Sequence, residues 1–300
     1  MYKRQILEIV DFLNARAREN QWGFVDFNRP MVAINQWEQA ADSMYTLCGK
    51  DRIHPSTDGH LVMAYLFLKA QGLAGKPVAD IRIDGAGKKV TRSDNCRVSD
   101  LSVSSDNLTF TYEAKSLPYP IDTSYYDNEK HTQADALSVI PFMDEMNYEG
   151  LSVSGLSDGY YGLTIGGEFI GRFTARELER GINMALLQNT PQYKQAMKIR
   201  QMNEERWLKE RKMREFYWVE YNLMRKTGML WACDEAAVDT LRKYRPHDIF
   251  LQWNGDLWLQ YMHKGIREDC VNEQQNLVDR IYEQNKPIPL RIEIKKFTDL

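Results

Sequence analysis

The segment from Leu61 to Leu68 is apolar on nearly every side of a helix, and it constrains the fold more than any other part of the sequence. Thr57 or Asp58 can cap the start of this helix, and Gly72 stands where a left-handed C-cap residue belongs. A helix that is apolar all round has to be buried on most of its circumference. We therefore predict that this helix packs inside a layered fold.

The residues before this helix predict one end of a doubly wound α/β domain. Apolar residues recur every three or four positions from Ile6 to about Asn20, which is helical spacing, and the run Trp22–Phe27 predicts a strand. Residues 28–50 have no clear period and are expected to form a long loop with a helical turn near 36–44. This order of elements is typical of one end of such sheets, where ligands bind beyond the carboxyl ends of the strands. Because a sheet needs about three or more strands to be stable alone, we expect the domain to be incomplete.

Beyond Pro77 the sequence changes to short alternating runs, at Val78–Ile83, Val98–Val103, Leu108–Tyr112 and Leu151–Val153, separated by turn residues. Two similar runs flank Gly166-Gly167, and two glycines at that position predict a tight hairpin. The expected organisation is an α/β fold with three parts: the end of a doubly wound domain over 1–77, a β-rich accessory region over 78–173, and a mainly helical extension over 174–300.

The extension opens at Thr174, whose spacing to Glu177 is that of a capping box. Further helices are expected from Pro191 to about Gly228, after a cap at Asp234, and between Trp253 and about Gln284, with a last strand over Leu290–Ile294.

The composition limits the kinds of molecule that the chain is expected to bind. With 43% hydrophobic and 27% charged residues the chain is typical of a globular protein, and a net charge of −3 shows no electrostatic signature of nucleic-acid binding. No apolar run reaches the roughly 18 residues that a membrane span requires. Four cysteines occur without a CxxC motif or a histidine at zinc spacing, so we expect neither a metal nor another cofactor.

Asp51 precedes His54 by three residues in a loop that ends at Pro55. Within one loop turn this spacing lets a carboxylate approach Nδ1 of the imidazole while Nε2 faces outward. A histidine held in this way is a general base for a hydroxyl nucleophile, whereas the ordinary interpretation of the pair is a structural hydrogen bond.

The sequence Asp51-x-x-His54-Pro55, followed by Gly59-His60 and an apolar helix, resembles the last conserved block of SGNH hydrolases, the GDSL-type esterases and lipases. Downstream segments are similar to the accessory region of bacterial SGNH proteins with a long carboxyl-terminal extension: Asn147–Leu151, Val153–Leu156, Gly159-Tyr160, Gly166–Glu168 and Glu177–Asn183. The resemblance covers about residues 5–200. It implies a flavodoxin-like SGNH domain with His54 as the base and Asp51 as the orienting acid.

The Ser, Gly and Asn blocks that complete an SGNH site are missing from this sequence. Ser157-Asp158-Gly159 has the letters of the nucleophile motif in reverse order and lies in the accessory region. Cys48 is the other conceivable nucleophile, but nothing in the sequence predicts a lowered thiol pKa or an oxyanion hole. His60 is expected to be structural, and His131, His247 and His263 have no partners at metal-ligand spacing.

We therefore expect the chain to be the carboxyl-terminal fragment of a serine esterase, secreted or periplasmic in a bacterium, that hydrolyses a small-molecule or glycan ester. An acylated carbohydrate is the preferred substrate. Met1–Gln5 resembles a translated library adapter. The chain alone is expected to be inactive, and the helix at 61–72 and the strand at 22–27 are expected to expose apolar faces.

The alternative is a non-catalytic module that binds glycans or a partner protein on an SGNH remnant. The run Trp253–Trp258 could stack on sugar rings, although packing in a core is the ordinary interpretation of such a run.

Overall fold

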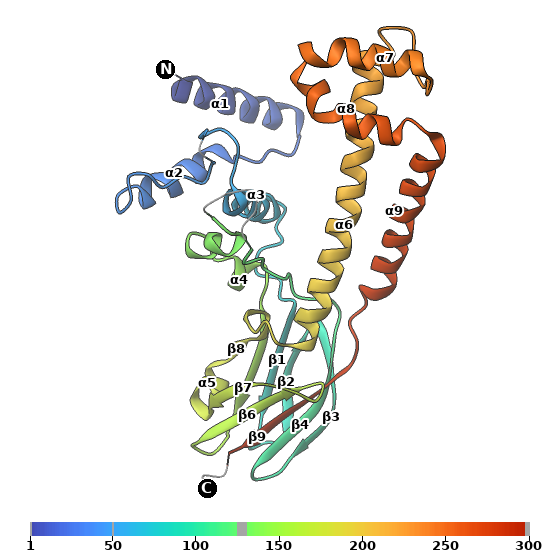
Figure 1. Ribbon diagram of the computed structural model, residues 1–300. Coiled ribbons are helices and arrows are strands. Elements are labelled where there is room, and N and C mark those ends of the chain that lie inside the picture. The colour runs from blue at the N-terminus through green and yellow to red at the C-terminus, as the bar shows by residue number, and fades with distance from the viewer. Residues whose placement is uncertain (1, 50, 125–130, 298–300) are drawn as a thin grey trace. The chain divides into compact units, whose positions relative to one another are not determined.

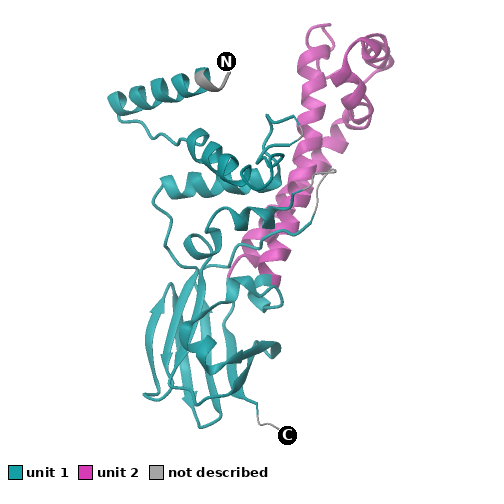
Figure 2. Cartoon of the chain, turned by 90° about the vertical axis from the view of Figure 1, so that its left-hand side faces the viewer, with its two compact units in different colours: residues 1–193, 287–300 teal, residues 194–286 magenta. Residues whose placement is uncertain are grey.

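The computed structural model describes residues 2–49, 51–124 and 131–297, with residues 2–4 described by their backbone alone. Met1, part of the predicted adapter sequence, lies outside this range. The chain divides into two compact units, residues 1–193 with 287–300 and residues 194–286 (Figure 2). Each unit is described by itself below.

Unit 1 begins with three helices, α1 (Tyr2–Asn20), α2 (Asn28–Glu38) and α3 (Thr57–Ala70) (Figure 1). The prediction of a strand at Trp22–Phe27 is wrong, since this segment has no regular structure and no described strand pairs with it. Instead it leaves α1 in a turn, with the Trp22 amide donating to the Ala17 carbonyl at 2.8 Å. The long loop expected at 28–50 is also partly wrong, because α2 occupies its first half.

The helix α3 is buried on one side rather than on most of its circumference. Leu61, Val62 and Tyr65 are buried, whereas Phe67 is 48% exposed. The buried side belongs to a cluster that includes Leu47, Ile121, Ile140 and Phe142. These partners come from the loop before α3 and from the segment around the short elements η1 (Gln133–Ser138) and α4 (Phe142–Glu145). They cover one side of α3 only.

The β-rich region forms two sheets. The first has the order β2-β1-β5-β8, in which β1 (Ala79–Asp84) pairs antiparallel with β2 (Lys89–Asp94) and parallel with β5 (Glu149–Ser154), and β8 (Ile182–Asn183) lies beside β5. The second is antiparallel throughout, with the order β3-β4-β9-β6-β7: β3 (Cys96–Val103), β4 (Asn107–Ala114), β9 (Leu290–Lys296), β6 (Tyr160–Ile165) and β7 (Glu168–Thr174). The strands expected near 78–83, 98–103, 108–112 and 151–153 are all present, whereas β2 and β8 were not expected.

The predicted Gly-Gly hairpin is confirmed. Ile165 pairs with Glu168 across the two-residue turn, and Gly166 and Gly167 have φ of +61° and +85°. Positive φ at both central residues is the geometry of the type I′ turn that matches the twist of two strands.

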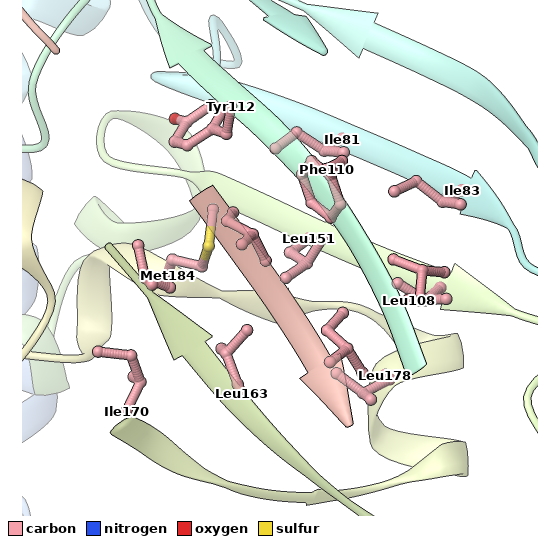
Figure 3. Close-up of a cluster of buried hydrophobic side chains, with 14 of the residues drawn as sticks. Ile81, Ile83, Leu108, Phe110, Tyr112, Leu151, Leu163, Ile170, Leu178 and Met184 are labelled. Carbon is pink, nitrogen blue, oxygen red and sulfur yellow. The ribbon is translucent and has the colours of Figure 1, made fainter. Parts of the chain in front are cut away.

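One apolar core joins the two sheets (Figure 3). Ile81 and Leu151 come from the first sheet, Phe110 and Leu163 from the second, and all four side chains are fully buried. The final strand β9 lies in the middle of the second sheet, with Ile294 opposite Leu108 on one side and Leu163 on the other. The strand β9 therefore completes the core of unit 1.

A short helix, α5 (Ala175–Arg180), follows β7. Its capping box is confirmed, because the Thr174 hydroxyl accepts from the Glu177 amide at 3.1 Å while the Glu177 carboxylate accepts from the Thr174 amide at 2.7 Å. A single 3₁₀ turn, η2 (Met184–Leu186), precedes the long helix α6 (Pro191–Val219).

Unit 2 is helical and begins within α6. A π-helical turn, η3 (Glu220–Met224), extends α6, and α7 (Glu235–Tyr244), η4 (Arg245–His247), α8 (Ile249–Tyr261) and α9 (Lys264–Gln284) follow. Asp234 caps α7 as predicted, accepting from the Ala237 amide at 3.0 Å. The core of unit 2 contains Phe216, Leu251 and the fully buried Trp258, so this tryptophan packs in a core, whereas Trp253 is 66% exposed.

The chain is therefore a mixed α/β protein with two sheets and a long helical region. Over residues 2–49 and 51–77 it forms helices and, at Cys48 and Pro55, one isolated bridge, without the sheet of a doubly wound domain. The boundaries at 77 and 173 stay predictions.

Candidate functional site

The loop that carries Asp51 and His54 is closed by backbone hydrogen bonds. At its base the Ser56 amide donates to the Leu47 carbonyl at 3.0 Å, and the Gly49 amide donates to the His54 carbonyl at 2.7 Å. Arg52 has a φ of +57°, and this left-handed residue reverses the chain between the two sides of the loop. The loop is therefore a closed turn in which residues 51 and 54 face each other.

Both oxygens of the Asp51 carboxylate are engaged. Oδ1 accepts the amides of Ile53 and His54 at 2.9 and 3.1 Å, which is an Asx turn, and Oδ2 lies 2.5 Å from Nδ1 of His54. The hydrogen bond with His54, reinforced by the two amides, lowers the pKa of Asp51 to about 2. An ionised carboxylate against Nδ1 favours the tautomer with its proton on Nδ1, which leaves Nε2 as the basic atom.

Three residues fix this loop to the start of α3. The Ser56 hydroxyl donates to the Leu47 carbonyl at 3.1 Å and also hydrogen-bonds Oδ1 of Asp58, a carboxylate that is only 1% exposed. A Cβ at Gly59 would lie 2.0 Å from the Leu47 oxygen, so only glycine allows the helix to approach the loop this closely. Sequence reasoning singled out neither Ser56 nor this role of Gly59. The sequence Ser56-x-Asp58-Gly59 could have indicated both roles, because the small residue Gly59 directly follows Asp58, a possible helix cap.

The imidazole itself is open to solvent. The His54 side chain is 83% exposed, and neighbouring Ile53 is 74% exposed. No hydrogen bond from Nε2 to another residue occurs within the described ranges. The loop thus orients the His54 imidazole, and the ring itself is exposed to solvent.

Neither candidate nucleophile is suited to the task. Burial raises the pKa of the Cys48 thiol, which favours the less reactive protonated form. The Ser157 hydroxyl accepts from the Lys296 ammonium at 2.8 Å and lies 3.1 Å from the Tyr161 hydroxyl, so its contacts are with the second sheet rather than with a histidine.

The remaining histidines do not form a metal site. His131 lies with Nδ1 3.6 Å from Asp58, beside the anchored end of the loop, and its ring makes an edge contact with Tyr45. His60 is exposed on α3. Among the described residues no cluster of His, Cys, Asp and Glu could hold a metal ion, and no helix there is long and apolar enough to cross a membrane.

Large apolar side chains are exposed in the first 67 residues of unit 1, the part of the sequence that contains the loop. Trp37 is 80% exposed, and Trp22 and Phe67 belong to the two segments expected to expose apolar faces. The other members of this set are Ile6, Leu7, Ile9, Phe12, Leu13 and Met44. So many unburied apolar side chains on one segment are typical of a surface that contacts further protein.

Comparisons with known proteins relate the helical region to a deacetylase family and most of the chain to a solved enzyme. Residues 197–286 match the family described as the diltiazem deacetylase C-terminal helical domain. Among solved structures, the chain is similar to a gut microbial diltiazem-metabolizing enzyme, with 41% identity and a TM-score of 0.91 over 98% of this chain and 66% of that chain. The chain therefore spans about two thirds of the length of that relative. Comparison with curated proteins finds no match.

Proposed function

We propose that this chain supplies the base and the orienting acid of an SGNH-type serine esterase. His54 takes the proton of a serine hydroxyl through Nε2, and Asp51 holds the imidazole through Nδ1 and stabilises the imidazolium that forms. The serine oxygen then attacks the ester carbonyl, and His54 returns the proton to the departing alcohol, which leaves an acyl-serine. Water that gives its proton to His54 then attacks the acyl-serine, and the same proton passes to the departing serine oxygen as the acid is released. The observation that carries the proposal is the 2.5 Å contact between Asp51 Oδ2 and His54 Nδ1, with Nε2 on the open side.

The serine and the oxyanion donors belong, in this proposal, to a segment outside the 300 residues. Two observations support this. A third of the similar enzyme has no counterpart in this chain, and α1, α2 and α3, which come before and after the Asp51–His54 loop in the sequence, carry exposed apolar side chains. Packing a further segment against these side chains would bury apolar surface, at about 25 cal/mol per Å², and would bring new groups toward His54.

The ester bond is the proposed reaction class because residues 197–286 match the family of a deacetylase's C-terminal helical domain, and removing an acetyl group from an oxygen is ester hydrolysis. An acylated carbohydrate is the proposed natural substrate. Hydrolysis of an acetyl ester releases acetate and an alcohol, and no step requires a metal or an organic cofactor.

Complementation tests the proposal. The chain is expressed together with the segment of the diltiazem-metabolizing enzyme that lies outside the match, and hydrolysis of p-nitrophenyl acetate is compared with that of each part alone. We expect activity only for the combination, and modification by phenylmethylsulfonyl fluoride at a serine of the added segment. Equal activity of the chain alone, or a modified serine within its 300 residues, would overturn the proposal.

A further inference from the structure

Unit 2 contains a cavity of about 580 Å³ that the esterase proposal does not use. Its volume is within the range of roughly 300–1,000 Å³ that is usual for small-molecule sites. The lining comes from the end of α6, the turn before α7 and the first turns of α9. The residues used below are Tyr217, Trp231, Lys264, Arg267, Glu268 and Asn272.

Two aromatic rings form a corner in this cavity. The rings of Tyr217 and Trp231 are 6.0 Å apart at 86°, and both side chains are partly exposed, at 39% and 45%. Trp231 is also stacked on the buried ring of Phe216, at 6.5 Å and 29°. Two aromatic rings at a right angle therefore line the cavity, and one of them, Trp231, rests on the core residue Phe216.

The position of Trp231 is fixed by a buried carboxylate. Its amide donates to Oε2 of Glu220 at 2.9 Å, and Oε1 of the same residue accepts from the indole of Trp258 at 2.8 Å. Glu220 is 1% exposed and lies in the π-helical turn η3. This arrangement holds Trp231 at a φ of +65°, so the aromatic corner is preformed.

The polar rim carries both signs of charge and no excess of either. Lys264 lies 3.3 Å from Glu268, and Arg267 is already engaged, donating to the carbonyls of Tyr261 and Met262 at 2.7 Å each. Asp269 and Asn272 add a carboxylate and an amide. A charged ligand would therefore meet cations and anions together, whereas a ligand with hydroxyl groups would find both donors and acceptors.

We propose that this cavity binds a neutral saccharide. The C–H face of a pyranose ring suits the aromatic corner, and its hydroxyl groups, which both donate and accept, suit Lys264, Glu268 and Asn272. The inference deepens the proposed function by giving unit 2 affinity for carbohydrate, the class of compound to which the proposed substrate belongs, and only that link rests on the esterase proposal. Binding itself requires neither the ester nor His54.

The test is titration of the 300-residue chain with neutral oligosaccharides, namely cellohexaose, xylohexaose and mannohexaose, by isothermal calorimetry and tryptophan fluorescence. We expect at least one of them to bind. Trp231→Ala should weaken binding about tenfold, the effect of losing one stacked ring. Lys264→Ala, a change on an exposed side chain that leaves the fold intact, should weaken it as well. Trp253→Ala removes an exposed tryptophan of the same unit outside the cavity and should leave binding unchanged.

Three results would overturn the inference. They are no binding of any of the three sugars, an equal loss of affinity in Trp253→Ala and Trp231→Ala, and an affinity that neither Lys264→Ala nor Trp231→Ala changes. Saccharide binding without ester hydrolysis in the complementation experiment would instead refute the esterase proposal and favour the glycan-binding module.

Discussion

Asp51 contacts His54 twice, through Oδ2 to the ring atom Nδ1 at 2.5 Å and through Oδ1 to the backbone amide of the same histidine at 3.1 Å. One carboxylate therefore fixes both the position of the backbone and the direction of the ring. The ring is thus oriented without any substrate or further segment, which is the arrangement that general-base catalysis needs.

The Asp51 carboxylate is expected to titrate near pH 2, measured by carboxyl ¹³C NMR. Because the folded pKa lies below the ordinary value of about 3.9, its interactions stabilise the folded loop above about pH 4 and are lost as the pH falls toward 2. His54→Ala should raise this pKa, since it removes the largest cause of the shift. His60→Ala should not change it, and an equal rise in both variants would show that the ring contact is not responsible.

Gly59→Ala is expected to lower the free energy of unfolding of unit 1 by about 1–3 kcal/mol, because the added methyl would meet the Leu47 carbonyl oxygen at 2.0 Å and force the backbone apart. Gly23→Ala is the matched control, since no atom lies within 4 Å of a Cβ at that position. Its effect should stay within about 0.5 kcal/mol. Urea unfolding followed by circular dichroism measures both, and similar values for the two variants would contradict the close approach of α3.

Glu149 is fully buried, and burial raises its pKa to about 7 despite hydrogen bonds from Tyr112 at 2.8 Å and Gln192 at 3.2 Å. A folded pKa above the ordinary value means that stability present below about pH 4 is lost as the pH rises through 7. We expect a loss on the order of 3 kcal/mol between about pH 4 and pH 8. Glu149→Gln should remove most of this pH dependence, whereas Glu179→Gln, at an exposed position, should retain it. If both variants kept the pH dependence of stability, the titrating group would be a residue other than Glu149.

In unit 2, Trp258→Phe keeps a buried ring but removes the indole N–H that donates to Glu220 at 2.8 Å. An unsatisfied buried carboxylate oxygen should lower the free energy of unfolding by about 1–3 kcal/mol. Trp253→Phe, on an exposed side chain, should change it by less than about 0.5 kcal/mol. Thermal melts compare the two, and no difference between them would mean that the Glu220 contact contributes nothing.

The local features of the fold were predictable from the sequence. The Gly166-Gly167 turn, the Thr174 capping box and the Asp234 cap each depend on residues within a few positions of one another. The approach of Asp51 to Nδ1 of His54 was predictable for the same reason, because a single turn joins them. Its catalytic role stays a prediction.

The features that were predicted wrongly or not at all depend on interactions between segments that are distant in the sequence. Trp22–Phe27 has the composition of a strand, but no strand among the described residues pairs with it, and strand propensity without a partner does not make a sheet. The strand β9 was expected, but its place between β4 and β6 depends on pairing across more than a hundred residues. The cavity of unit 2 was not foreseen because Tyr217, Trp231 and Lys264 come from three separate segments.

The catalytic roles of Asp51 and His54 are tested most directly by the kcat for p-nitrophenyl acetate of the complemented esterase carrying Asp51→Asn, His54→Ala or His60→Ala. We expect a loss of about 10⁴-fold for Asp51→Asn, a loss on the order of 10⁶-fold for His54→Ala, and an unchanged rate for His60→Ala. An active esterase whose kcat is unaltered by His54→Ala would contradict the assignment of His54 as the base.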